Sequence, residues 1–188
     1  MDTQQGRPRR YDFQPDANFA CAEAAWYVAA LDELLERLSD LLVGTPQEVL
    51  EFVPEGGCNS MAMMARHIAW GEAGWISGLT KVDIPDDLME QLKPGKQGPS
   101  GELEPSSMSG EELIALCRRV REEITRPGVS KVTDMQAKTQ AGDKPIDARA
   151  ILMNQLWHWT HSTGQIALIR RLAGAKYQWR YPEEIRSR

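Results

Sequence analysis

Apolar residues recur every three or four positions over long stretches of this chain of 188 residues, and this spacing is the strongest constraint on its fold. The first such stretch covers residues 16–43, and it is followed by Gly44, a residue type that commonly ends a helix. Its apolar positions are Ala20, Ala24, Tyr27, Leu31, Leu34, Leu35, Leu38 and Leu42. Side chains at this spacing lie on one face of an α-helix, so the stretch predicts a long helix with one buried face.

Three further stretches have the same period and carry signals for helix ends. We predict these helices over residues 59–79, from Ser109 to the residue before Pro127, and over residues 147–173. The first of them begins at Asn59, a common N-cap residue, and the second begins at Ser109, which forms a capping-box pattern with Glu112. Gly174 closes the last one, and a short connecting helix is predicted over residues 48–52.

Two long connections separate these helices. Residues 80–107 are dense in Pro, Gly and Ser, which predicts a surface loop with one helical turn at residues 87–92, and a loop of this length often covers a pocket. Residues 129–144 are polar and lack a helical period, which leaves either a short strand pair or an irregular crossover. The sequence thus predicts an all-α fold, a four-helix bundle with long connections between helices 2 and 3 and between helices 3 and 4. We expect residues 1–15 to be a flexible tail and residues 16–188 to form one domain.

Charge and cysteine usage exclude several classes of function. The formal net charge of −5 argues against nucleic acid as a partner, and the basic clusters at residues 7–10 and 180–188 are expected to be solvated tails. No apolar run approaches the roughly 20 residues that cross a bilayer, and the first residues lack a secretory signal, so we expect no membrane partner. The widely spaced Cys21, Cys58 and Cys117 favour neither a disulfide framework nor a thiolate zinc site, which is typical of a reduced, cytoplasmic setting.

All three histidines lie in the predicted helices, His67 in the second and the other two in the fourth. A polar set shares one face of the fourth helix at steps of four, three and four: Asn154, His158, His161 and Gln165, with Ser162 beside them. Apolar residues flank this set, so we expect the face to turn inward, with Asn154, Ser162 and Gln165 lining a pocket. Imidazole is the commonest neutral ligand of zinc and nickel, and His67 from a facing helix would complete a three-histidine site. Histidines in helices are also often hydrogen-bonded core residues, so the residues alone leave both interpretations open.

Two segments resemble the motifs of a known family. Residues 59–72, NSMAMMARHIAWGE, resemble the second-helix motif of the DinB-like superfamily, in which Asn-Ser precedes a helical histidine and an acidic residue. Residues 158–174, HWTHSTGQIALIRRLAG, resemble its fourth-helix motif, which contains Gly-Gln and an arginine before the closing glycine. The resemblance implies a DinB-like four-helix bundle, frequently a homodimer, in which three histidines hold a divalent metal ion, zinc or nickel.

One ligand position departs from the family pattern. His67 and His158 match the first two ligands, but the family usually places the third histidine four residues after the second, where this chain has Ser162. His161 lies one position earlier on the same side of the helix, so the expected ligand set is His67, His158 and His161. Two alternatives stay open: Ser162 binds the ion weakly or through water, or the ion has been lost, because a neutral hydroxyl is a poor ligand for zinc or nickel.

The resemblance implies an enzyme in which the metal ion lowers the pKa of a bound thiol or water. Some members of the superfamily are S-transferases or isomerases that use a low-molecular-weight thiol. This chain is therefore expected to be a metal-dependent S-transferase or hydrolase acting on a small molecule, and the alternative is a non-catalytic bundle that binds a small ligand or serves as a dimeric stress-related protein. Glu72 lies about 140° round the helix from His67, which favours a structural salt bridge over a role as proton acceptor.

Overall fold

The computed structural model describes residues 13–57, 59–99, 101–141 and 144–177. Most of the expected N-terminal tail, the basic clusters at residues 7–10 and 180–188, and Cys58 lie outside the described residues. In the part that is described, no helix combines the length and the apolar composition that crossing a membrane requires.

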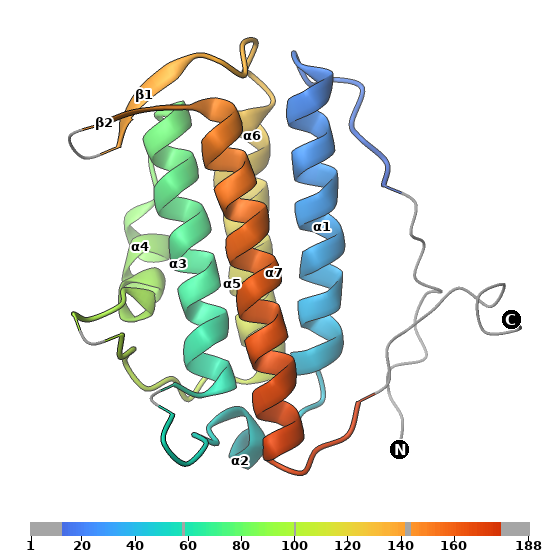
Figure 1. The fold of residues 1–188 in the computed structure, drawn as a ribbon, viewed down its shortest axis with the longest axis vertical. Coiled ribbons are helices and arrows are strands. Elements are labelled where there is room, and N and C mark those ends of the chain that lie inside the picture. The colour runs from blue at the N-terminus through green and yellow to red at the C-terminus, as the bar shows by residue number, and fades with distance from the viewer. Residues whose placement is uncertain (1–12, 58, 100, 142–143, 178–188) are drawn as a thin grey trace, which may run out of the picture.

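Helices form most of the described chain, and the long ones run side by side (Figure 1). The helices are α1 (Ala22–Leu42), α2 (Gln47–Leu50), α3 (Met61–Thr80), α4 (Asp86–Leu92), the 3₁₀ turn η1 (Lys93–Gly95), α5 (Gly110–Val120), the π-helical turn η2 (Arg121–Thr125), α6 (Arg126–Val129) and α7 (Ala148–Leu172). Strands β1 (Lys138–Ala141) and β2 (Lys144–Asp147) form an antiparallel hairpin. The prediction of a mostly helical fold is confirmed. For the last connection the sequence left a strand pair or an irregular crossover open, and the hairpin shows that the strand pair forms.

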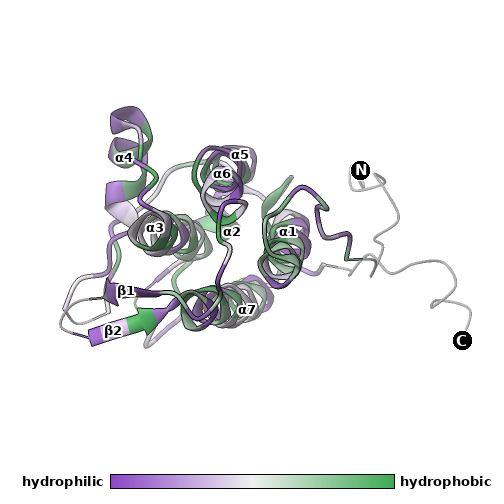
Figure 2. Ribbon diagram, turned by 90° about the horizontal axis from the view of Figure 1, so that it is seen from above, coloured by the Kyte–Doolittle hydropathy of each residue, from purple (hydrophilic) through white to green (hydrophobic). Residues whose placement is uncertain are grey.

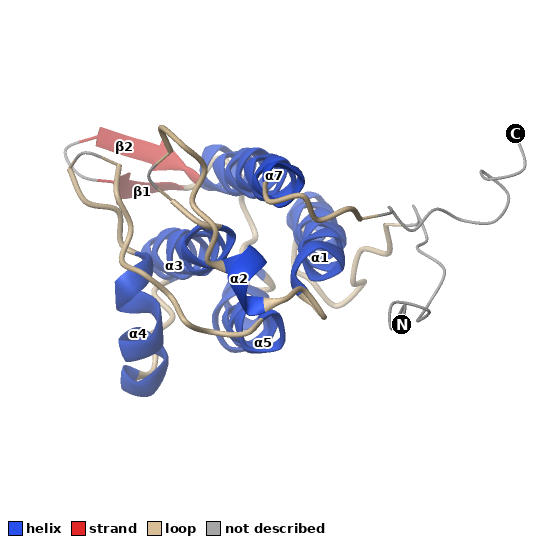
Figure 3. Cartoon of the chain, turned by 90° about the horizontal axis from the view of Figure 1, so that it is seen from below, coloured by secondary structure: helices blue, strands red, loops and turns tan. Residues whose placement is uncertain are grey.

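Four long helical segments surround one apolar core. Figure 2 shows them end on, with α1 and α3 each packed against both α7 and the continuous segment of α5, η2 and α6. Helix α4 lies outside this group against α3, and α2 lies across one end of it (Figure 3). The largest fully buried apolar side chains are Leu31, Leu38, Leu41, Leu42, Leu50, Met61, Ile68, Ile76, Leu88, Leu92 and Trp159. Any polar group that enters between the four segments is therefore removed from water and needs a partner.

Local capping residues fix several helix ends where the sequence predicts them. The Ser109 side chain accepts a hydrogen bond from the Glu112 amide at 3.2 Å, and the Glu112 carboxylate accepts one from the Ser109 amide at 2.7 Å, which confirms the capping box. Asp147 caps α7 by accepting a hydrogen bond from the Ala150 amide at 2.8 Å. Gly174 follows α7 with φ of 77°, a left-handed conformation that glycine adopts without strain.

Two predicted helix starts are wrong. The first long helix begins at Ala22 rather than at residue 16, because the segment before it forms turns, in which the Asp16 side chain accepts a hydrogen bond from the Asn18 amide at 2.9 Å. The N-cap of α3 is Ser60 rather than Asn59. The Asn59 side chain instead binds backbone groups of the loop that precedes α5, so a tertiary contact takes the place of a cap.

The prediction that the third long helix stops before Pro127 is also wrong. The helix passes through the π-helical turn η2, where the Arg126 amide donates to the carbonyl of Arg121, five residues back. Pro127 then lies near the start of α6, where its missing N–H costs little. A single wide turn therefore lets the helix continue to Val129 and changes the face that its side chains present.

The connection over residues 80–107 is partly structured and packs on the side of α3. It contains α4 and η1, so the predicted helical turn at residues 87–92 is confirmed and extends by a 3₁₀ turn. Contacts between η1 and α3 bring Gly95 and the two residues after it beside the middle of α3. This connection thereby supplies one wall of the site described next.

Candidate functional site

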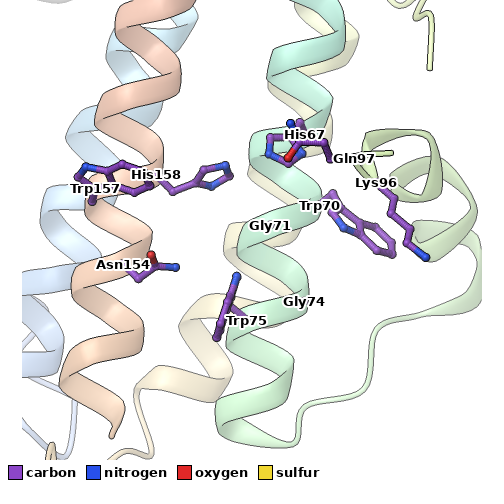
Figure 4. Close-up of a pocket in the computed structure, with 10 residues that line it drawn as sticks. All are labelled: His67, Trp70, Gly71, Gly74, Trp75, Lys96, Gln97, Asn154, Trp157 and His158. Carbon is purple, nitrogen blue, oxygen red and sulfur yellow. The ribbon is translucent and has the colours of Figure 1, made fainter. Parts of the chain in front are cut away.

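His67 from α3 and His158 from α7 meet between the two helices, near the middle of each (Figure 4). Their ring centroids are 4.9 Å apart, and the rings stand nearly perpendicular at 86°. The helical spacing places each histidine on the face that its helix turns toward the other, as the sequence predicts. The structure therefore brings two of the three histidines into direct contact.

A backbone carbonyl fixes the orientation of His67. Its Nδ1–H donates a hydrogen bond to the Gly95 carbonyl at 2.8 Å, which leaves Nε2 as the ring nitrogen that is not used in this bond. Gly95 is buried, and a Cβ at this position would lie 2.6 Å from the Arg66 carbonyl oxygen. Only glycine allows η1 to approach α3 this closely, so Gly95 is a structural requirement for the orientation of His67.

A second glycine makes room for His158. Gly71 faces its ring, and a Cβ on Gly71 would lie 2.8 Å from Cε1 of His158. Burial lowers the pKa of His158 to about 4, and the neighbouring His67 and His161 act in the same direction, so the imidazole is neutral at pH 7. Its Nδ1 is buried and has no hydrogen-bond partner within the described part of the chain. A neutral, half-buried imidazole with an unpaired nitrogen is suited to bind a ligand that the protein does not itself supply.

His161 lies outside this pair. Its ring stacks on the exposed ring of Trp157, with centroids 5.2 Å apart and an angle of 10° between the planes. Within the described residues, no group of three or more His, Cys, Asp or Glu side chains is placed to hold a metal ion. The structure thus joins His67 and His158 but leaves the third expected ligand on the surface.

The three expected pocket residues have three different environments. Asn154 lies one helical turn before His158 and lines the pocket beside the histidine pair. Ser162, at the usual position of the third family ligand, is buried at 2% exposure, and Gln165 is exposed to solvent. Of the three, Asn154 alone belongs to the pocket lining that the described residues form.

The pocket has a volume of about 490 Å³ and opens between α3, α7 and the segment after η1. Its lining consists of His67, Trp70, Gly71, Gly74, Trp75, Lys96, Gln97, Asn154, Trp157 and His158. Figure 4 shows Trp75 and Asn154 near the histidine pair, and Trp70 with Lys96 on the far side of α3 from His158. The volume falls within the range of about 300–1,000 Å³ that is typical of small-molecule sites.

Glu72 is turned away from the pocket into a buried ion-pair network. Its carboxylate accepts hydrogen bonds from Arg121 at 2.8 and 3.0 Å and from the Thr125 hydroxyl at 2.5 Å. Arg121 also donates to Asp32 at 2.5 Å and lies 5.4 Å from the ring centroid of Trp159. The interpretation of Glu72 as a structural salt-bridge residue is confirmed.

The charge state of Arg121 is held by its two carboxylate partners. Burial opposes the charged form, but the adjacent Glu72 and Asp32 raise the pKa of Arg121 above its ordinary value. The sequence does not mark Arg121 as a buried residue, because its partner Glu72 is 49 residues away and no local pattern links the two. The sequence offers one indication of its burial: Arg121 directly follows Val120, an apolar position of the predicted helix that begins at Ser109.

A family model described as the DinB superfamily matches residues 30–166. The chain belongs to the DinB superfamily. This match includes His67, His158 and His161, and it confirms the resemblance stated from the two motifs. The search of curated proteins gives no match.

A solved structure supports the DinB fold. The chain is similar to a DinB-like protein from Bacillus cereus ATCC 10987, with a TM-score of 0.63 and 18% sequence identity. The similarity covers 83% of this chain and 96% of the other. At this identity the likeness concerns the fold and carries no information on activity.

The divalent metal ion implied by the DinB resemblance has two suitable donors here. His67 has its Nδ1–H bound to a backbone carbonyl, which is the usual partner of a metal-binding histidine, and His158 has an unpaired buried nitrogen. The described residues supply no third His, Cys, Asp or Glu beside them. The site therefore fits a centre with two histidine ligands, and it differs from the three-histidine centre that the resemblance implies.

Proposed function

We propose that this chain is a divalent-metal-dependent enzyme with a DinB-like four-helix bundle, and that His67 and His158 hold the ion, zinc or nickel. The observation that carries the proposal is the contact between these two rings, with Nδ1 of His67 bound to the Gly95 carbonyl. Two imidazoles from facing helices, one oriented by a carbonyl, are residue types that such an ion takes as ligands.

The substrate in this proposal is a small molecule that enters the open pocket beside the histidine pair. When bound, the metal ion supplies Lewis acidity that lowers the pKa of a thiol or water, which suits S-transfer from a low-molecular-weight thiol or hydrolysis. Asn154 lies within the same lining and offers an amide to orient a polar group of the substrate. Glu72 has no part in the proposed chemistry, because its carboxylate is fully engaged by Arg121 and Thr125.

The proposal assigns no ligand role to His161 while it is stacked on Trp157. To join the pair, His161 would have to leave that ring and turn inward past a buried position of α7. Ser162 occupies the inward-facing position and is buried. The proposed centre is accordingly weaker than one with three histidines, since each ligand adds to the affinity.

Metal content tests the proposal directly. Protein purified without a His tag and without chelator is analysed for zinc, nickel, iron and manganese per chain, before and after incubation with zinc. We expect close to one ion per wild-type chain and a loss of binding in His67→Ala and in His158→Ala. His161→Ala is the matched control, and it should keep its metal. Equal metal content in wild type and His67→Ala would contradict the proposal, and a protein that takes up no zinc or nickel would leave the non-catalytic alternative.

The proposal includes a homodimer. Large apolar side chains are exposed along one side of α7, at steps of four, eleven and four: Met153, Trp157, Leu168 and Leu172. An exposed apolar stripe on a long helix is typical of a surface that pairs with another chain. Light scattering coupled to gel filtration should give a dimer for wild type and a monomer for Leu168→Glu. A monomeric wild-type protein would contradict this part of the proposal.

A further inference from the structure

The charge of the pocket lining differs from that of the whole chain. The chain has 27 acidic and 22 basic residues. Among the described residues that line the pocket there is no carboxylate, and Lys96 is the one residue with a formal positive charge. An acidic protein with a pocket of this composition favours an anionic ligand over a cationic one.

The same lining is unusually rich in tryptophan. Three of the six tryptophans in the chain, Trp70, Trp75 and Trp157, line this pocket. The side chain of Trp75 is 40% exposed, although an indole ring is among the groups that gain most from burial. Trp157 stacks on His161 and belongs to the exposed apolar stripe of α7. Indole rings that remain accessible around a pocket are suited to cover a flat apolar ligand.

The positions of these groups define the two ends of a ligand. Figure 4 shows Lys96 and Trp70 on the η1 side of α3, Trp75 on its α7 side, and Trp157 on α7, turned away from α3. Gly74 lies in the lining between these groups, and a Cβ built on it meets no atom within 4 Å. The glycine thereby keeps open the space between the charged end and the aromatic end.

We infer that the pocket takes a small aromatic carboxylate, with its carboxylate at Lys96 and its ring over Gly74, between Trp70 and Trp75. The inference rests on the proposed function, because it takes this ligand as the substrate that the histidine pair acts on. A volume of about 490 Å³ accommodates one or two fused rings with a short acidic substituent. Gln97 and Asn154 add side-chain amides to the same lining, which can donate to carboxylate or substituent oxygens.

The first experiment compares two ligands of nearly equal shape. Binding of 2-naphthoate and of uncharged 2-naphthalenemethanol to the full chain is measured by calorimetry, with chelator-treated protein and with zinc-loaded protein. We expect 2-naphthoate to bind three- to fivefold more tightly than the alcohol to the chelator-treated protein, the difference expected of one exposed ion pair. The zinc-loaded protein should show a larger preference, because the ion adds positive charge to the same lining. In chelator-treated Lys96→Gln the preference should disappear. Lys93→Gln, on the 3₁₀ turn that precedes Lys96 but outside the lining, is the control and should keep it.

A second pair of variants tests the place of the aromatic ring. Gly74→Leu adds a side chain inside the pocket, whereas Gly78→Leu adds the same side chain one turn further along α3, outside the lining. At both glycines a Cβ meets no atom within 4 Å, so both variants should fold. We expect Gly74→Leu to weaken 2-naphthoate binding at least tenfold and Gly78→Leu to leave it unchanged.

Each result separates the inference from the proposed function. Absence of 2-naphthoate binding, an unchanged preference in Lys96→Gln, or equal binding by Gly74→Leu and Gly78→Leu would overturn the inference. Metal content measured on the same samples reports on the function. Zinc uptake without 2-naphthoate binding overturns the inference and leaves the metal centre, whereas 2-naphthoate binding without zinc uptake supports the ligand class and contradicts the metal-dependent enzyme.

Discussion

The cluster around Arg121 and the pair around His158 both place polar groups between the long helices, but they differ in how completely these groups are paired. Arg121 is 1% exposed in its side chain, and it binds Glu72 through two nitrogens and Asp32 through the third. Nδ1 of His158 is equally removed from solvent and has no partner in the described part of the chain. The two regions adjoin along α3, where Gly71 faces His158 and the next residue, Glu72, binds Arg121.

This difference determines what each group can offer to a ligand. A buried charge with all its partners in place stabilises one arrangement of the helices and has nothing left to offer a ligand. A buried nitrogen without a partner costs stability, and a bound ligand can recover that cost. Pairing therefore assigns Glu72 a structural role and leaves His158 with a nitrogen that a ligand can occupy, although both are polar residues that face a neighbouring helix.

The largest expected effect comes from breaking the Arg121 cluster. Arg121→Met should lower the free energy of unfolding by about 3–5 kcal/mol, because it leaves the fully buried Glu72 carboxylate without its cation. Urea denaturation measures this change. The control is Arg119→Met on the same helical segment, where the arginine is partly exposed and pairs with Asp87 and Glu123, and there we expect a loss of at most about 1 kcal/mol. Equal losses in the two variants would contradict the structural role assigned to Arg121.

The second prediction concerns pH and the metal-free protein. His158 has a pKa of about 4 in the folded chain against an ordinary value of 6.5, so the unfolded chain takes up a proton in this interval before the folded one does. Its contribution to stability is complete above pH 6.5 and is lost as the pH falls toward 4. The loss should amount to about 2–3 kcal/mol, at about 1.4 kcal/mol for each pKa unit with a reduction for partial exposure.

Other groups titrate in the same pH interval, so the effect of His158 is measured as the difference between wild type and a variant that lacks it. Unfolding free energies of chelator-treated wild type and His158→Gln are compared from pH 7.5 to pH 4. Wild type should lose more stability than the variant as the pH falls. Parallel curves would show that His158 is not the buried neutral group described above.

The third prediction tests how His67 is oriented. In Gly95→Ala the new Cβ would lie 2.6 Å from the Arg66 carbonyl oxygen, so η1 has to move away from α3 and its hydrogen bond to His67 is lost. We expect a stability loss of about 1–3 kcal/mol, as for other overpacked sites, and zinc affinity about 10–100-fold lower. Competition with a chromogenic chelator measures the affinity. Unchanged zinc affinity would argue against the carbonyl as the group that orients His67.

The smallest effect distinguishes two glycines on one helix. Gly74→Ala should stabilise the protein by about 0.5–1 kcal/mol, since its Cβ meets nothing within 4 Å and alanine favours the helix. Gly71→Ala should show no such gain and should weaken zinc binding, because its Cβ would displace the His158 ring. Thermal unfolding and zinc competition on both variants test this. A gain of equal size in both would mean that His158 does not depend on Gly71.

Local sequence signals predict the elements well and the contacts between them poorly. Ser109 with Glu112 and Gly174 act within one turn, so their spacing alone predicts the helix ends. Pro127 misleads because the π-helical turn that admits it has no local sequence signature. Asn59 misleads because its side chain binds a loop more than 40 residues away instead of capping α3.

The same limit applies to the candidate site. Helical spacing predicts that His67 and His158 face each other, and the family motifs predict the same two residues. Spacing also groups His161 with His158, but a step of three residues leaves His161 about 60° round the helix from His158, and the exposed Trp157 offers its ring on that side. The roles of Gly71 and Gly95 depend on close approach between separate segments, which no pattern within either segment encodes.

Arg121 also sets the register of the helices. Sliding α3 along its neighbour by one turn, about 5.4 Å, would replace one apolar contact by another but would part Glu72 from the guanidinium. Because Asp32 on α1 and Trp159 on α7 contact the same guanidinium, all four long segments are aligned by one residue. Gly71 precedes Glu72, so the alignment that satisfies the arginine is the one that places Gly71 beneath His158. The ion pair between Glu72 and Arg121 therefore sets the position of Gly71, and with it the place where the two imidazoles meet.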